Sequence, residues 1–153
     1  MPKQIIKNIL TVTHGIIAHG TNCRHAFGSG MAGAIKKKWP IVYESFMQQG
    51  KGEKMLGTSY LVRVNDDDLS PLWVANCYTQ LDYGHMNIKY ASPNAIYTAL
   101  DNVLTLAKFF DVPVYMPKIG AGLGGLDWSL DVEPIISKLE EEHDTVITVC
   151  NLM

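Results

Sequence analysis

Residues 15–35 read GIIAHGTNCRHAFGSGMAGAI. The nearly continuous apolar run at the start predicts a strand over Gly15–His19 that is covered on both faces of its sheet. Three glycines follow, Gly28, Gly30 and Gly33, and the apolar residues after them recur at helical spacing. A strand, a glycine loop and a helix in this order indicate a βαβ unit whose ligand lies at the carboxyl end of the strand.

A second glycine loop, KIGAGLGGLDW at residues 118–128, lies between the expected strand Pro113–Met116 and a helix over residues 129–143. Either loop alone also fits a tight turn that needs positive φ. Glycine lets backbone N–H groups approach an anion, and the helix N-terminus adds unpaired donors. Two such loops facing each other would hold a diphosphate from both sides. The sequence contains no G-x-x-x-x-G-K-[ST] motif, which excludes a P-loop.

The remaining elements alternate in type along the chain. The strands expected besides these two are Gln4–Ile6, Met55–Val64, Leu72–Tyr78 and Thr145–Cys150. The helices expected are residues 29–49, 93–110 and 129–143, with a kink or break at Pro40. This alternation predicts an α/β fold with a largely parallel sheet and helices on both faces. A length of 153 residues without a linker predicts one domain, residues 1–153.

Composition narrows the classes of function. A net charge of -2 argues against a nucleic-acid partner or a membrane surface. The first ten residues, MPKQIIKNIL, are too short and too polar for a signal peptide, so we expect a cytoplasmic protein. We also expect a monomer. Three widely spaced cysteines and five scattered histidines predict no disulfide scaffold, no metal site and no cofactor.

The segment AHGTNC places His19 and Asn22 at the end of the first buried strand. Histidine can act as general base or acid near neutral pH, and an asparagine amide can bind sugar hydroxyls. The alternative is a polar pair whose hydrogen bonds are satisfied by the loop backbone. Ser29 either caps the first helix or donates to a phosphate, and Asp127 either caps the third helix or acts as an acid.

These motifs resemble those of a known family. IIAHGTNCRHAFGSGMAGAIKKKWP together with YMPKIGAGLGGLDW is similar to the macro domain family of ADP-ribose-binding modules. YTQLDYGHMNIKYASPNAIYTAL, residues 78–100, resembles the compact phage and bacterial branch described as ADP-ribose-1″-phosphate phosphatases. The resemblance implies a three-layer αβα sandwich around a mixed six-stranded sheet, with ADP-ribose lying across the strand ends.

The resemblance also implies a set of site residues. Those implied for the distal ribose and one side of the diphosphate are Asn22, Gly28, Ser29, Gly30 and Met31. Those implied for the other side are Ile119, Gly120, Ala121, Gly122, Leu123 and Gly124. Those implied for the adenine end are Asn8, Ile9 and Leu152. Many macro domains carry aspartate at the position of Asn8, and the lysine-dependent de-ADP-ribosylating branch carries aspartate at the position of Gly124.

The resemblance favours hydrolysis of ADP-ribose-1″-phosphate at the distal ribose, without a metal and with His19 and Asn22 as catalytic residues. Two alternatives stay open at this point. One is a hydrolase that removes acetyl or ADP-ribosyl groups from the same sugar. The other is a non-catalytic module that binds ADP-ribose.

Overall fold

A single mixed sheet forms the centre of the computed structural model, which describes residues 1–28, 30–84, 86, 88–122 and 124–152. Six strands lie in the order β1-β6-β5-β2-β4-β3. Their bounds are β1 Lys3–Ile6, β2 Gly15–Asn22, β3 Ser59–Arg63, β4 Leu72–Gln80, β5 Val114–Met116 and β6 Ile147–Asn151. Only the pairing of β3 with β4 is antiparallel, which confirms the mixed, largely parallel six-stranded sheet.

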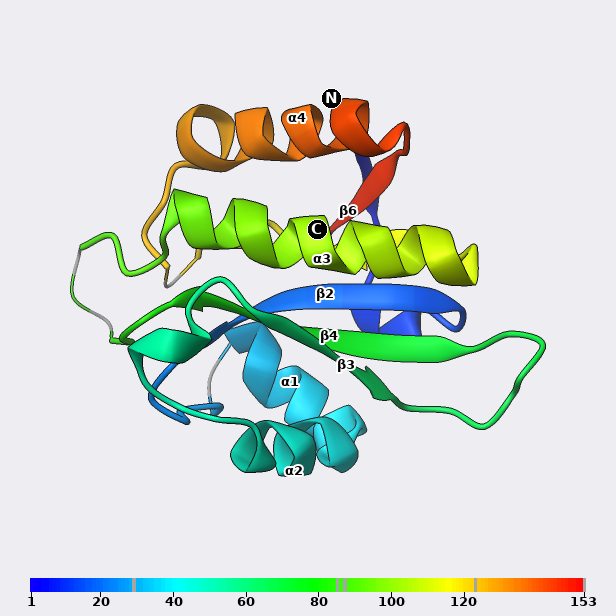
Figure 1. The fold of residues 1–153 in the computed structure, drawn as a ribbon, viewed down its shortest axis with the longest axis horizontal. Coiled ribbons are helices and arrows are strands. Elements are labelled where there is room, and N and C mark those ends of the chain that lie inside the picture. The colour runs from blue at the N-terminus through cyan, green and yellow to red at the C-terminus, as the bar shows by residue number, and fades with distance from the viewer. Residues whose placement is uncertain (29, 85, 87, 123, 153) are drawn as a thin grey trace.

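Helices cover both faces of this sheet (Figure 1). Helices α3 (Pro93–Phe110) and α4 (Glu133–His143) pack on one face, and α1 (Gly30–Lys38) and α2 (Pro40–Gln48) pack on the other. Each face has its own apolar core. Leu100 of α3 belongs to the first core, and Phe46 of α2 belongs to the second. The three-layer αβα sandwich is therefore confirmed.

Several boundaries differ from those expected. Strand β2 continues past His19 to Asn22, because these residues pair with β4 through a register shift at Thr21. Strand β3 is shorter than expected, since the three residues Glu53–Met55 form a 3-10 turn instead. The first helix is two helices, and Pro40 begins the second of them, in agreement with its missing N–H donor. A π-helical turn, Trp128–Val132, precedes α4.

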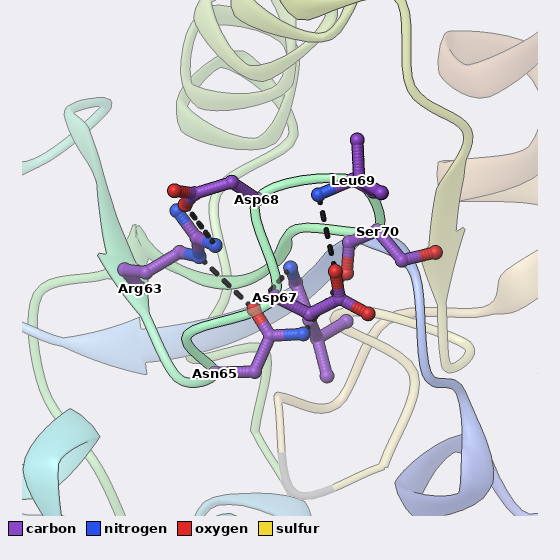
Figure 2. Close-up of polar contacts among 7 residues, drawn as sticks. Arg63, Asn65, Asp67, Asp68, Leu69 and Ser70 are labelled. Atoms are coloured by element: carbon purple, nitrogen blue, oxygen red, sulfur yellow. Dashed lines mark hydrogen bonds and ion pairs between the residues drawn. The ribbon is translucent and has the colours of Figure 1, made fainter.

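The turn between β3 and β4 is closed by the side chain of Asn65 (Figure 2). Its Oδ1 accepts from Arg63 Nε at 3.0 Å and from the Leu72 amide at 2.9 Å, while its Nδ2 donates to the Ser70 carbonyl. Arg63 also pairs with Asp68 at 3.2 Å. The acidic residues 66–68 therefore belong to an exposed hairpin turn.

The sheet order decides where a ligand can bind. Strand β2 lies between β5 and β4, and all three run parallel. Their carboxyl ends therefore meet at one edge, and the loops that follow them open on the same side. None of the helices in the described part of the chain is long and apolar enough to cross a membrane.

Candidate functional site

Both glycine loops open onto the same cavity at this edge of the sheet. The cavity has a volume of about 410 Å³, within the range typical of small-molecule sites. From the side of β2 and α1 it is lined by the expected residues His19, Asn22, Gly28, Gly30 and Met31. From the side of β5 it is lined by the expected residues Ile119, Gly120, Gly122 and Gly124. The two loops thus face each other across one space, as the sequence predicts.

Four expected residues do not line this cavity. They are Asn8, Ile9, Ala121 and Leu152. Ser29 and Leu123 lie outside the described residues. Ile9 is buried in the core on the α1 side, and the Oδ1 of Asn8 accepts from the Leu10 amide at 3.0 Å. The Asn8 oxygen therefore caps a short 3-10 helix, and it is already occupied where the resemblance implies a contact with adenine.

Backbone amides are the main donors that the loops present. In the second loop, the amides of Gly120, Gly122 and Gly124 meet no acceptor among the described residues, whereas their neighbours Ala121 and Gly125 donate within the loop. On the opposite side lies the N-terminus of α1, whose first-turn amides have no acceptor within the helix. Neutral donors therefore converge on the cavity from two directions, an arrangement suited to a diphosphate.

The segment that follows β4 holds the second glycine loop in place. The carbonyl of Gly124 accepts from two amides at once, those of Tyr90 at 2.8 Å and Ala91 at 2.9 Å. At Gly125, φ is +79°, and an added methyl group would overlap the carbonyl oxygen of Ile88. This is one position where the fold requires glycine.

His19 lies on the floor of the cavity and is 1% exposed. Its Nε2 is 2.6 Å from Oδ1 of Asn76, and its ring meets Phe27 edge-to-face at 5.5 Å. Burial lowers the pKa of His19 to about 4, and the hydrogen bond with Asn76 offsets only part of that effect. The ring is therefore neutral at pH 7, so it can accept a proton there but does not carry one to donate as a resting acid.

Asn22 shapes the loop that follows β2. Its Oδ1 accepts from the amides of Arg24 at 2.9 Å and Ala26 at 3.2 Å, and its Nδ2 donates to the Ala26 carbonyl at 2.7 Å. Most of its hydrogen-bonding capacity is satisfied by the loop, the simpler of the two interpretations of this residue. One N–H of the amide remains for a ligand, because Nδ2 has two protons.

Asp127 is a helix cap. Its Oδ1 accepts from the Leu130 amide at 2.9 Å, at the start of the π-helical turn that leads into α4. The same residue donates its own amide to Asp131. The interpretation of Asp127 as a cap is confirmed.

Sequence reasoning did not place several lining residues in the site, among them Thr79, Gln80, Phe27 and Lys118. Thr79 and Gln80 end strand β4, and the parallel pairing of β4 with β2 is the signal that would have found them.

Lys118 is the first residue of the second glycine loop and is exposed. Among the described lining residues it is the only cationic side chain, and none of them carries a carboxylate. Across the described ranges, no three His, Cys, Asp or Glu side chains gather as metal ligands.

Comparison with known proteins gives the family. The model of the Macro domain family matches residues 18–136, and the chain therefore belongs to the macro domain family. An uncharacterized 17.5 kDa protein of enterobacteria phage T4 is 34% identical over 138 residues, which cover 86% of this chain and 83% of that protein.

Two further relatives are similar over most of their length. The ADP-ribose 1″-phosphate phosphatase of Lodderomyces elongisporus is 29% identical over 137 residues, covering 82% of this chain and 81% of that protein. A macrodomain protein from Streptomyces coelicolor has a solved structure that matches with a TM-score of 0.75 and 26% identity, covering 99% of each chain.

Proposed function

We propose that this protein binds ADP-ribose in the cavity between its two glycine loops and hydrolyses the phosphate of ADP-ribose-1″-phosphate. The observation that carries the proposal is the convergence of both loops, with their free amides, above the buried ring of His19. The relative from Lodderomyces elongisporus supports the choice of substrate by its name. In the reaction, water adds to phosphorus and the bond from phosphorus to the 1″ oxygen breaks, which releases inorganic phosphate and ADP-ribose.

The residues divide into binding and reacting groups. The amides of Gly120, Gly122 and Gly124 and the start of α1 hold the diphosphate and offset its charge. Met31 and Ile119 supply apolar walls to the cavity. His19 acts as general base toward the attacking water. A phosphate dianion beside the ring favours its protonated form, so the pKa of His19 rises when substrate binds. Asn22 holds the loop and directs its remaining N–H toward the distal ribose.

The test compares three substrates at equal concentration: ADP-ribose-1″-phosphate, an O-acetyl ester of ADP-ribose and a glutamate-linked conjugate. We expect phosphate release from the first and no turnover of the other two. His19→Ala is expected to abolish turnover, with a loss of about 100-fold or more, and to leave the Kd for ADP-ribose within about threefold. His143→Ala is the matched control, because that histidine pairs with Asp101 and lies outside the cavity lining. Unchanged turnover of His19→Ala would remove this ring from the mechanism.

A second candidate function is a module that binds ADP-ribose without turning it over. It is favoured by the absence of any carboxylate among the described lining residues, which leaves His19 without an acidic partner. Calorimetric binding of ADP-ribose without turnover of any of the three substrates would support this candidate.

The de-ADP-ribosylating alternative has less support. Gly124 stands where that branch has aspartate, and Lys89 pairs with Asp131 at 3.2 Å without lining the cavity.

A further inference from the structure

His19 and Asn76 are neighbours by strand register. They are Cα partners in the parallel pair β2–β4, so their side chains project from the same face of the sheet. That face is the one covered by α1 and α2, because Ile17 and Val74, two residues earlier on each strand, belong to the core on that side. The pairing therefore follows from the backbone and does not depend on a flexible loop.

The contact between the two side chains selects one proton position. His19 Nε2 lies 2.6 Å from Asn76 Oδ1, and a carboxamide oxygen only accepts hydrogen bonds. Nε2 therefore carries the proton of the neutral ring, and Nδ1 carries the lone pair. Within the described residues, Nδ1 has no hydrogen-bond partner. Nδ1 is itself buried, so it can accept a proton only from a group that reaches it through the cavity that His19 lines.

Asn76 is expected to destabilise the fold at its position. It is 0% exposed, its Nδ2 has no partner among the described residues, and its neighbours Val74, Ala75 and Cys77 are apolar or weakly polar. A buried amide that lacks one hydrogen bond destabilises a fold. An apolar side chain would suit this strand better, and the only hydrogen bond that its side chain makes among the described residues is the one to His19.

We propose that Asn76 is a positioning residue for His19: it fixes the ring in the tautomer whose Nδ1 is free to act as base. This inference rests on the proposed function. The edge of Phe27 against the same ring supplies the second constraint on its orientation.

The first test is the tautomer of His19 in the ligand-free protein, read from the ring nitrogens by long-range ¹H–¹⁵N NMR near neutral pH. We expect a single neutral species protonated on Nε2. A ring protonated on Nδ1 overturns the proposal. This readout needs no enzymatic activity, so it stands even where the proposed function fails.

The second test removes the acceptor with Asn76→Leu, which keeps a similar volume and supplies an apolar side chain. We expect loss of the single Nε2-protonated species and a fall in kcat of about 100-fold, with KM and the Kd for ADP-ribose within about threefold. Cys77→Ala is the matched control, because Cys77 is equally buried on the same strand but packs in the core on the other face. It is expected to keep both the tautomer and kcat.

Retention of kcat within about twofold in Asn76→Leu overturns the proposal. An equal loss of kcat in Cys77→Ala does so too, since the effect would then be general to β4. Where Asn76→Leu does not fold, Asn76→Ala takes its place, with the same two outcomes. No turnover by the unaltered protein would overturn the proposed function instead, and the NMR measurement would still decide whether Asn76 controls the ring.

Discussion

Burial lowers the pKa of the His19 ring, and the proposed chemistry depends on this shift. Its pKa falls to about 4, whereas burial raises the pKa of Cys77, at the adjoining register position on β4, to about 12. Both groups are therefore neutral at pH 7, the His19 ring on the cavity side of the sheet and the Cys77 thiol in the core on the other face. A neutral ring beside the cavity avoids a permanent buried positive charge that would need its own counterion.

Acid should destabilise the fold through His19. The unfolded ring binds a proton below about pH 6.5 and the folded ring only near pH 4, so the unfolded state holds more protons between these values. The free energy of unfolding should therefore decrease as pH falls, by about 2 kcal/mol from this group between about pH 7.5 and pH 5. Urea unfolding at several pH values measures the slope, and His19→Asn should flatten it. Equal slopes for the two proteins would contradict the prediction.

At the scale of elements, the second glycine loop and the segment after β4 form one unit. Gly125 lies against Ile88 with φ of +79°, so Gly125→Ala introduces both backbone strain and overlap with a backbone atom. We expect a loss of about 3 kcal/mol in the free energy of unfolding and weaker ADP-ribose binding. Chemical denaturation and calorimetry measure the two effects.

Gly122→Ala is the matched control for this variant. A methyl group at Gly122 meets nothing within 4 Å. Its free energy of unfolding should stay within about 0.5 kcal/mol of the unaltered protein. A similar loss in both variants would show that the strain at Gly125 is not what matters.

Elements that depend on local sequence pattern could be predicted, whereas those that depend on pairing between distant strands could not. The strands β2, β4 and β5 and the helix α3 are predictable because continuous apolar runs and a helical stripe are local properties of the sequence. The extension of β2 to Asn22 and the antiparallel direction of β3 are not, since they depend on pairing with β4. The π-helical turn before α4 is likewise set by the cap at Asp127 and by packing.

The site divides in the same way. The glycine loops could be predicted because each lies between an apolar run and a helical pattern, and His19 because it ends the apolar run of β2. Thr79 and Asn76 come from β4, and only the register of that strand brings them to His19 and the cavity. Asn8 does not line the cavity, and its side-chain oxygen caps a 3-10 helix, so its contact with adenine stays a prediction.

At the scale of the whole molecule, we expect side-chain charge to contribute little to binding of the proposed ligand. The chain carries a net charge of -2, and Lys118 is the only cation among the described lining residues. Backbone amides are neutral, and salt screens them little. Raising NaCl from about 50 mM to about 500 mM should therefore weaken ADP-ribose binding by about threefold at most.

Lys118→Met provides the comparison for this measurement. It should remove most of the remaining salt dependence, as measured by calorimetric titration at both salt concentrations. A tenfold or larger loss of affinity in the unaltered protein at high salt would show that side-chain charge, rather than the backbone, dominates binding.

The carbonyl of Gly124 accepts hydrogen bonds from two amides at once. A ligand in the cavity can therefore affect the segment to which those amides belong. A ligand that immobilises the turn after β5 should also immobilise Tyr90 and Ala91. These two residues directly precede Ser92, the N-cap of α3. Deuterium uptake at the opening of that long helix should therefore slow when the cavity fills. The layer formed by α3 and α4 would thus respond to an occupied cavity through the contacts between this loop and the start of α3.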